Sequence, residues 1–213
     1  MRGKWFFLAV AGLFFLAACG PSEPPPPKGP SALDWYQKGE ALWTGHEFRP
    51  AAEAEGYFSR AIEKDPKLAE AYNRRGLIFL HTRRIELALA DFDRAISLKP
   101  TLAAAYSHRG YAYVRSGKRR QGFRDLNEAI RLEPQSDLAF NNRAVSYYLL
   151  GQYGRALADT NQSIRLNDSN ARAYANRGRI YERLRRDAKA CGDWRKACAL
   201  RFEQACGWER SQC

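Results

Sequence analysis

The stretch AEAYNRRGLIFL, residues 69–80, returns in three later copies along this chain. The copies are AAAYSHRGYAYV at 103–114, DLAFNNRAVSYY at 137–148 and ARAYANRGRIYE at 171–182. The aromatic residue of each copy recurs every 34 residues, and one more aromatic lies 37 residues earlier, which gives Trp35, Tyr72, Tyr106, Phe140 and Tyr174. Self-similarity at this period indicates a stacked array of structural repeats.

Each repeat contains two amphipathic helical patterns that cannot bury their apolar faces alone. A small residue lies four positions after each aromatic, where a partner helix can approach closely, at Gly39, Gly76, Gly110, Ala144 and Gly178. Small residues also recur in the second helical pattern, at Ala54, Ala88, Gly122, Ala156 and Ala190. Prolines end the first three units at Pro66, Pro100 and Pro134.

These positions resemble the signature of the tetratricopeptide repeat. The resemblance implies an all-α, right-handed helical solenoid of about five helix pairs. From the C-terminal cysteines, discussed below, we also expect a disulfide-bridged capping helix at its C-terminal end. We expect the solenoid to occupy 32–213, with units at about 32–68, 69–102, 103–136, 137–170 and 171–201 and the cap at 202–213. The chain departs from the pattern by three extra residues within TGHEFRPAAE (44–53), by Thr160 at a large apolar position and by Asp168 in place of a fourth proline.

Two charged columns follow the same period. Arginines recur at Arg75, Arg109, Arg143 and Arg177, and aspartates recur sixteen residues after each of them, at Asp91, Asp125, Asp159 and Asp193. We predict ion pairs between the two helices of each unit, because such pairs explain both columns at once. The alternative is a ladder of charges that binds a ligand.

The N-terminus has the features of an export signal. In MRGKWFFLAVAGLFFLAAC (1–19), two cations precede an apolar run from Trp5 to Ala18, which is shorter than the roughly 20 residues that span a bilayer. The last four residues resemble the bacterial lipobox, which implies a signal peptide at 1–18 and a lipidated, palmitate-bearing Cys19. An uncleaved anchor and an ordinary signal peptide are the alternatives.

The resemblance to lipoproteins implies a location in the cell envelope. Gly20 after Cys19 favours the outer membrane, facing the periplasm, over the inner membrane. The segment up to Ser31 contains six prolines, so residues 19–31 are expected to form an extended linker between the lipid anchor and the solenoid.

Four cysteines remain after Cys19, at Cys191, Cys198, Cys206 and Cys213. An exported chain favours disulfides, and pairs seven residues apart on one helix lie roughly 10 Å apart, too far for a bridge. Facing residues of an antiparallel hairpin keep a constant sum of residue numbers, which favours Cys198 with Cys206 and Cys191 with Cys213. A zinc site of four thiolates is the alternative, although the usual short ligand spacing is missing.

Composition argues against several other functions. The chain has 35 Lys and Arg against 23 Asp and Glu, a formal charge of +12, which favours anionic partners. Its three histidines are far apart, and the sequence has no phosphate loop, HExxH motif or catalytic triad pattern, so we expect neither an enzyme nor a cofactor or metal site. Nucleic acid is not an expected partner, because the aromatics occupy core positions of the repeats and the chain carries an export signal.

The remaining surface is the concave face that stacked first helices create. By resemblance, the residues just after each aromatic, and those that follow one turn and two turns later, form a peptide-binding groove. The candidate groove residues are Asn73, Arg74, His108, Arg115, Asn141, Asn142, Asn176, Arg179 and Arg183. Asparagine amides bind peptide backbone and arginines bind carboxylates, so we expect an extended or acidic segment of a protein partner. Solvated polar residues with no binding role are the alternative.

These features together predict a membrane-anchored periplasmic adaptor that binds another envelope protein. The rival function is binding of an anionic envelope polymer or of lipid headgroups through the basic surface.

Overall fold

In the computed structural model, residues 29–44 and 47–213 are described, and the proposed signal peptide at 1–18 and Cys19 lie outside them. The described residues form eleven α-helices and no sheet, with one isolated β-bridge between Trp43 and Phe48. The helices are α1 (Ala32–Glu40), α2 (Ala51–Lys64), α3 (Ala69–His81), α4 (Ile85–Leu98), α5 (Ala103–Arg115), α6 (Arg119–Leu132), α7 (Asp137–Leu149), α8 (Tyr153–Leu166), α9 (Ala171–Arg183), α10 (Asp187–Ala199) and α11 (Glu203–Gln212).

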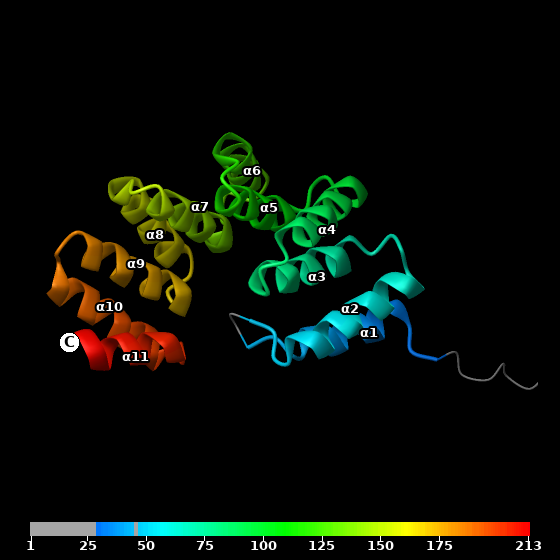
Figure 1. The fold of residues 1–213 in the computed structure, drawn as a ribbon, viewed down its shortest axis with the longest axis horizontal. Helices are drawn as coiled ribbons and strands as arrows, with labels where there is room; N and C mark the ends of the chain where they lie inside the picture. The colour runs from blue at the N-terminus through cyan, green and yellow to red at the C-terminus, as the bar shows by residue number, and fades with distance from the viewer. Residues whose placement is uncertain (1–28, 45–46) are drawn as a thin grey trace, which may run out of the picture.

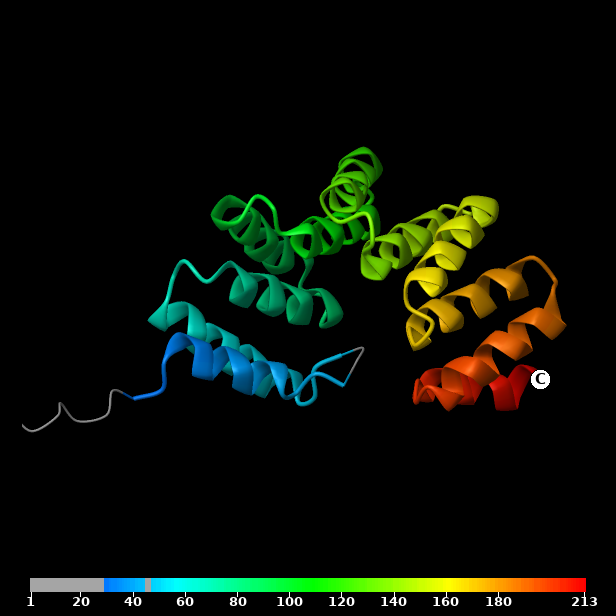
Figure 2. The same ribbon diagram turned by 180° about the vertical axis from the view of Figure 1, so that it is seen from behind.

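The helices form five consecutive pairs that stack into a curved solenoid, with α11 packed on the last pair (Figures 1 and 2). The first helices of neighbouring units contact one another, α3 with α5, α5 with α7 and α7 with α9. The second helices α4, α6 and α8 instead have their main contacts with first helices. The first helices therefore line the inner, concave side of the arc.

Small residues set the distance between the helices of a pair. In α5 and α6 the backbones of the two helices approach each other directly. A Cβ added at Gly110 would lie 2.8 Å from the carbonyl oxygen of Gly122. A Cβ added at Gly122 would lie 2.6 Å from the carbonyl oxygen of Gly110. In the first pair, the small residue Gly39 instead faces the ring of Phe58, which is fully buried. The small residues that recur in the sequence thus mark the places where a side chain or the backbone of the partner helix packs closely.

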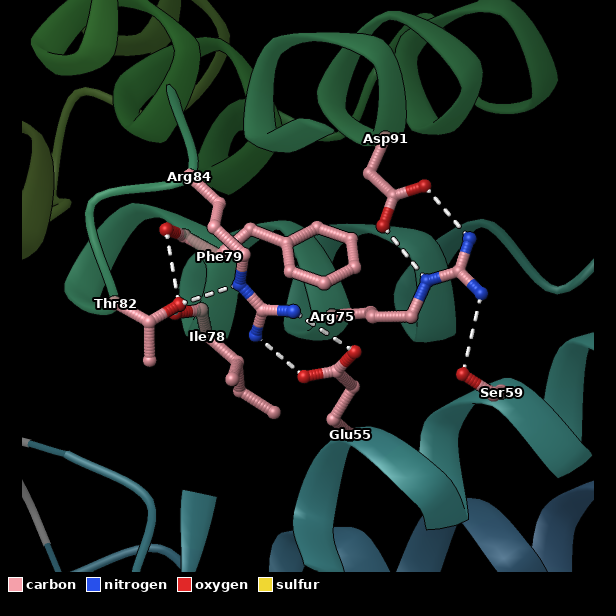
Figure 3. Close-up of polar contacts among 8 residues, drawn as sticks. All are labelled: Glu55, Ser59, Arg75, Ile78, Phe79, Thr82, Arg84 and Asp91. Atoms are coloured by element: carbon pink, nitrogen blue, oxygen red, sulfur yellow. Dashed lines mark hydrogen bonds and ion pairs between the residues drawn. The ribbon is translucent and has the colours of Figure 1, made fainter. Parts of the chain in front are cut away.

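The charged columns form ion pairs within each unit, as the sequence predicts. Each column arginine bonds both carboxylate oxygens of the aspartate sixteen residues later, and Arg75 does so with Asp91 at 2.8 and 2.9 Å (Figure 3). The same guanidinium also donates to Ser59 of the preceding unit at 3.2 Å. The corresponding acceptors in the later units recur with the period of the repeat, at Asp93, Asn127 and Asn161. Each arginine therefore joins two neighbouring units as well as two helices.

The first unit and the fourth unit each depart from the repeat pattern. α1 has nine residues, and the ten residues that follow it form a longer connection to α2, which accounts for the extra length of the first repeat. At the other departure, Thr160 is fully buried and its hydroxyl donates to the carbonyl oxygen of Ala156 at 2.6 Å. The hydroxyl is thus satisfied inside the helix, which explains how the core tolerates a polar residue there.

The C-terminal cap is bridged to the last unit. Disulfides join Cys191 to Cys213 and Cys198 to Cys206, with Cα–Cα distances of 5.7 and 4.8 Å. The two bridges link α10 to the antiparallel α11 at both ends of their contact. Between them a small aromatic cluster of Trp194, Phe202 and Trp208 covers the end of the core. The cap thereby replaces the neighbouring unit that the last helix pair lacks.

Two features are absent from residues 29–44 and 47–213. No helix in this part of the chain is long and apolar enough to cross a membrane. Nor does this part contain a cluster of three or more His, Cys, Asp or Glu side chains placed to hold a metal ion.

Candidate peptide-binding groove

The concave side contains a cavity of about 260 Å³, which we name the inner cavity. Helices α3, α5, α7, α9 and α11 line it. Its apolar wall consists of Leu77, Leu80, Tyr111, Leu138, Val145, Phe202 and Trp208. Its polar wall consists of His81, His108, Asn141, Asn142, Arg172, Asn176, Arg179 and Gln204. The inner cavity therefore combines cations and amides with aromatic rings.

Hydrogen bonds between neighbouring first helices run along the floor of the groove. Each bond joins residues 35 apart in sequence, and together they form a polar ladder of Asn73 with His108, Ser107 with Asn142, and Asn141 with Asn176. Their lengths are 2.9, 2.9 and 3.0 Å. All of these side chains are buried except that of Asn176, which is partly exposed. The predicted asparagines thus hold the units together, and Asn141, Asn142 and Asn176 also line the inner cavity.

The polar ladder does not use up the amides. A carboxamide has two donor hydrogens and an acceptor oxygen with two lone pairs, so one bond leaves further groups for a ligand. Asn142 donates to Ser107 through its nitrogen, and Asn141 accepts from Asn176 through its oxygen. The side-chain oxygens of Asn142 and Asn176 can therefore still accept backbone N–H groups of a bound segment.

His108, in the first rung of the polar ladder, is neutral. Burial lowers the pKa of its imidazole to about 3, and the positive charges of Arg74, His81 and Arg172 lower it further in the same direction. Because the Asn73 oxygen accepts, Nδ1 of the neutral ring is the donor of the bond between them. His108 consequently adds a hydrogen-bonding group to the inner cavity without adding a charge.

Two arginines give the inner cavity its charge. The guanidinium of Arg179 lies 5.0 Å from the ring centre of Tyr148 and 5.8 Å from that of Trp208, within the range of cation–π contacts. Burial lowers the pKa of Arg172, the second guanidinium in the wall. A partly desolvated guanidinium binds a carboxylate more strongly than an exposed one does.

The other predicted groove residues lie away from the inner cavity. Asn73 lies beneath His108 in the polar ladder, and Arg74 pairs with Glu40 of the first unit at 2.8 Å. Arg115 and Arg183 are exposed at the C-terminal ends of α5 and α9, where Arg183 donates to the Tyr153 hydroxyl at 3.1 Å. The structure therefore brings together five of the nine predicted residues: His108, Asn141, Asn142, Asn176 and Arg179.

Sequence reasoning missed the part of the cavity that the cap supplies. Phe202, Gln204 and Trp208 come from α11 and the turn before it, which the sequence indicates only as a closing helix. Arg172 was also missed, although it shares its repeat position with Leu138, another residue of the cavity wall.

The curved stack of helix pairs with a mixed polar and aromatic cavity on its concave side defines a helical-repeat solenoid. The family model described as tetratricopeptide repeat matches residues 36–103 and 109–165. The chain belongs to the tetratricopeptide repeat family, whose fold is typically a non-catalytic scaffold for protein interactions. No curated protein sequence matches the chain.

Solved structures show the same fold. TTC0263, a thermophilic tetratricopeptide repeat protein of Thermus thermophilus, is 19% identical with a TM-score of 0.77, and the match covers 85% of this chain and 98% of that one. PilW, a type IV pilus biogenesis factor, is 19% identical with a TM-score of 0.63, and the match covers 79% of this chain and 77% of PilW. The match to the Cut9–Hcn1 hetero-tetramer of the APC/C has 19% identity and a TM-score of 0.69 over 80% of this chain, which spans only 34% of that chain.

Proposed function

We propose that this protein is a non-catalytic adaptor that binds a segment of another cell-envelope protein on its concave face. The observation that carries the proposal is the inner cavity, where the Arg179 guanidinium lies among aromatic rings and beside the amides of the polar ladder. Such a set of groups suits an acidic side chain flanked by peptide backbone.

The size of the inner cavity limits what enters it. Small-molecule sites usually measure about 300–1,000 Å³, so a cavity of about 260 Å³ suits one or two side chains and not a long peptide. We therefore expect one acidic residue of the partner to enter as an anchor. The adjoining backbone would lie along the open concave surface and bond to Asn142 and Asn176.

We further propose that Cys19 carries lipid and holds the adaptor at the periplasmic side of the outer membrane. The support is the apolar segment of residues 5–18 with its lipobox-like end. PilW, a fold neighbour, is described as a pilus biogenesis factor, and this agrees with an assembly role in the envelope. If Cys19→Ser still yields a processed, membrane-bound protein of the same mobility, the proposal that Cys19 carries lipid is wrong.

The groove proposal is tested with an array of synthetic peptides that carry acidic, neutral or basic anchor residues. The intact chain should prefer acidic peptides, and Arg179→Glu should reverse that preference by about ten-fold or more. Lys64→Glu, at an exposed position of α2, is the matched charge reversal outside the groove and should keep the preference. If both variants bind acidic peptides as the parent does, the inner cavity does not read acidic anchors.

A further inference from the structure

A second, strongly charged cavity lies on the outer side of the solenoid. It has a volume of about 740 Å³ and is formed by the turn between α5 and α6 and the first turns of α6. Its lining residues are Gly117, Lys118, Arg119, Arg120, Gln121 and Arg124. We name it the basic pocket. The four cations are exposed, and the groove described above uses none of them.

The positive charge of the basic pocket is not neutralised. Among the described residues, Lys118, Arg119 and Arg120 take part in no ion pair. The closest carboxylate oxygen to Arg124 is that of Asp125 at 3.9 Å, and Asp125 already binds Arg109 at 2.6 Å. Lys118 lies 5.8 Å from the ring centre of Tyr113, a contact that leaves its charge in place. The first turn of α6 also contains no acidic residue.

The repeat fold does not require the three arginines, whereas the position of Lys118 also holds a cation in two other units, Arg84 and Arg186. In the second, fourth and fifth units the position of Arg119 holds Ile85, Tyr153 and Asp187, and that of Arg120 holds Glu86, Gly154 and Ala188. The position of Arg124 is Ala90, Ala158 or Gly192 elsewhere. The same helix pair therefore forms with neutral, apolar or acidic residues at these positions. Three arginines around one pocket are a feature of the third unit alone.

Four cations in one small volume repel one another, and a multivalent anion would relieve that repulsion. Guanidinium groups match the oxygens of phosphate through paired hydrogen bonds, and lysine adds a compact charge. We propose that the basic pocket binds phosphate groups, carried by a lipid headgroup or by a soluble phosphate compound. The site belongs to α6, a second helix, so it does not depend on peptide binding at the concave face.

The test uses the full chain and a variant that replaces the four cations by glutamine, Lys118→Gln, Arg119→Gln, Arg120→Gln and Arg124→Gln. A matched control removes four exposed cations elsewhere, Lys64→Gln, Lys67→Gln, Lys196→Gln and Arg210→Gln. The control loses the same net charge, so a difference between the two reports the position of the charges. Circular dichroism should show the same helix content in all three proteins.

The probes separate the sources of phosphate. Calorimetry measures binding of tripolyphosphate and, as an anion without phosphorus, of citrate. Sedimentation measures binding to phosphatidylcholine vesicles with and without phosphatidylglycerol, and the vesicles without it give the baseline for the apolar N-terminus. We expect the pocket variant to lose about ten-fold in affinity for at least one phosphate probe, and the control to lose less than about two-fold.

Each outcome decides the matter. A selective loss for tripolyphosphate alone supports a soluble phosphate ligand, a loss for phosphatidylglycerol alone supports a lipid headgroup, and both losses support phosphate from either source. Equal losses in the pocket variant and the control would show a general effect of net charge and overturn the site. Citrate that binds as tightly as tripolyphosphate, or an unchanged pocket variant, would overturn it as well.

Discussion

Arg109 bridges Asp125 of its own unit and Asp93 of the preceding unit, at 2.6 and 2.7 Å. The two carboxylates differ greatly in exposure, because the Asp125 side chain is 3% exposed and that of Asp93 is 54% exposed. One guanidinium thus makes a buried bond within a helix pair and an exposed bond between units. The two bonds should contribute very different amounts to stability.

Asp125→Ala should lower the free energy of unfolding by about 3 kcal/mol, because it leaves the largely buried Arg109 charge without its main partner. Asp93→Ala is the matched control and should cost less than about 1 kcal/mol, since its carboxylate is mostly in water. Urea denaturation followed by circular dichroism measures both. Equal losses in the two variants would contradict this ranking.

His108 should make the fold sensitive to mild acid. Its pKa is lowered to about 3, so the folded state binds fewer protons than the unfolded chain between that value and the ordinary pKa of about 6.5. Stability contributed by the neutral ring is therefore full above about pH 6.5 and is lost as the pH falls toward 3. From pH 7 to pH 5 the loss is about 2 kcal/mol.

His108→Gln should remove most of that loss, because glutamine does not titrate in this range. The measurement is the urea midpoint at pH 7 and at pH 5, where most carboxylates are still ionised. His81→Gln removes a neighbouring, exposed histidine, serves as the control and should change the pH dependence much less. A pH dependence that survives in His108→Gln would mean that other groups cause it.

Gly151→Ala should destabilise the protein by about 1 kcal/mol. Its φ is 73°, a left-handed conformation that side chains disfavour, although an added Cβ would meet no atom within 4 Å. Gly154→Ala in the helix α8 meets no atom either and should stabilise by about 0.5–1 kcal/mol. Thermal unfolding of both variants tests the pair, and shifts of the same sign would refute the backbone explanation.

The two disulfides should stabilise the cap to slightly different degrees. Cys191 and Cys213 are 22 residues apart and Cys198 and Cys206 are 8 apart, so chain entropy gives roughly 3.4 and 2.6 kcal/mol. Replacing each pair by serine should therefore lower the free energy of unfolding by about 3 kcal/mol, and the loss should be larger for Cys191 with Cys213. Proteolysis of α11 in each variant measures local opening. An α11 that stays resistant without both bridges would show that packing alone holds it.

Much of the fold could be predicted from the sequence, because the repeat imposes the same physical requirements in every unit. Glycines and alanines recur at a fixed spacing at the helix contacts. The ion pairs recur in the same way, as in Arg143 with Asp159 and Arg177 with Asp193. The helical hairpin geometry likewise indicates which cysteines face one another.

The groove was harder to predict, because it depends on contacts between units. Asn141 and Asn176 are among the predicted groove residues, but the sequence does not reveal that they bond to each other. Trp208 lies outside the repeat, so no periodic position assigns it to the inner cavity. The basic pocket is a local exception to the repeat, and the sequence shows it only as part of a general positive charge.

The bridged cap makes the C-terminal end of the solenoid more resistant to force than the N-terminal end. α1 is short and has its main contact with α2 alone, whereas α10 and α11 are joined covalently at two places. A pulling force applied N-terminal to α1 would unfold the first unit before the others, since each unit is stabilised chiefly by its neighbours. Phe202 and Trp208, at the end of the inner cavity, belong to the clamped end. A force transmitted through the proposed lipid anchor would thus reach that end of the cavity last.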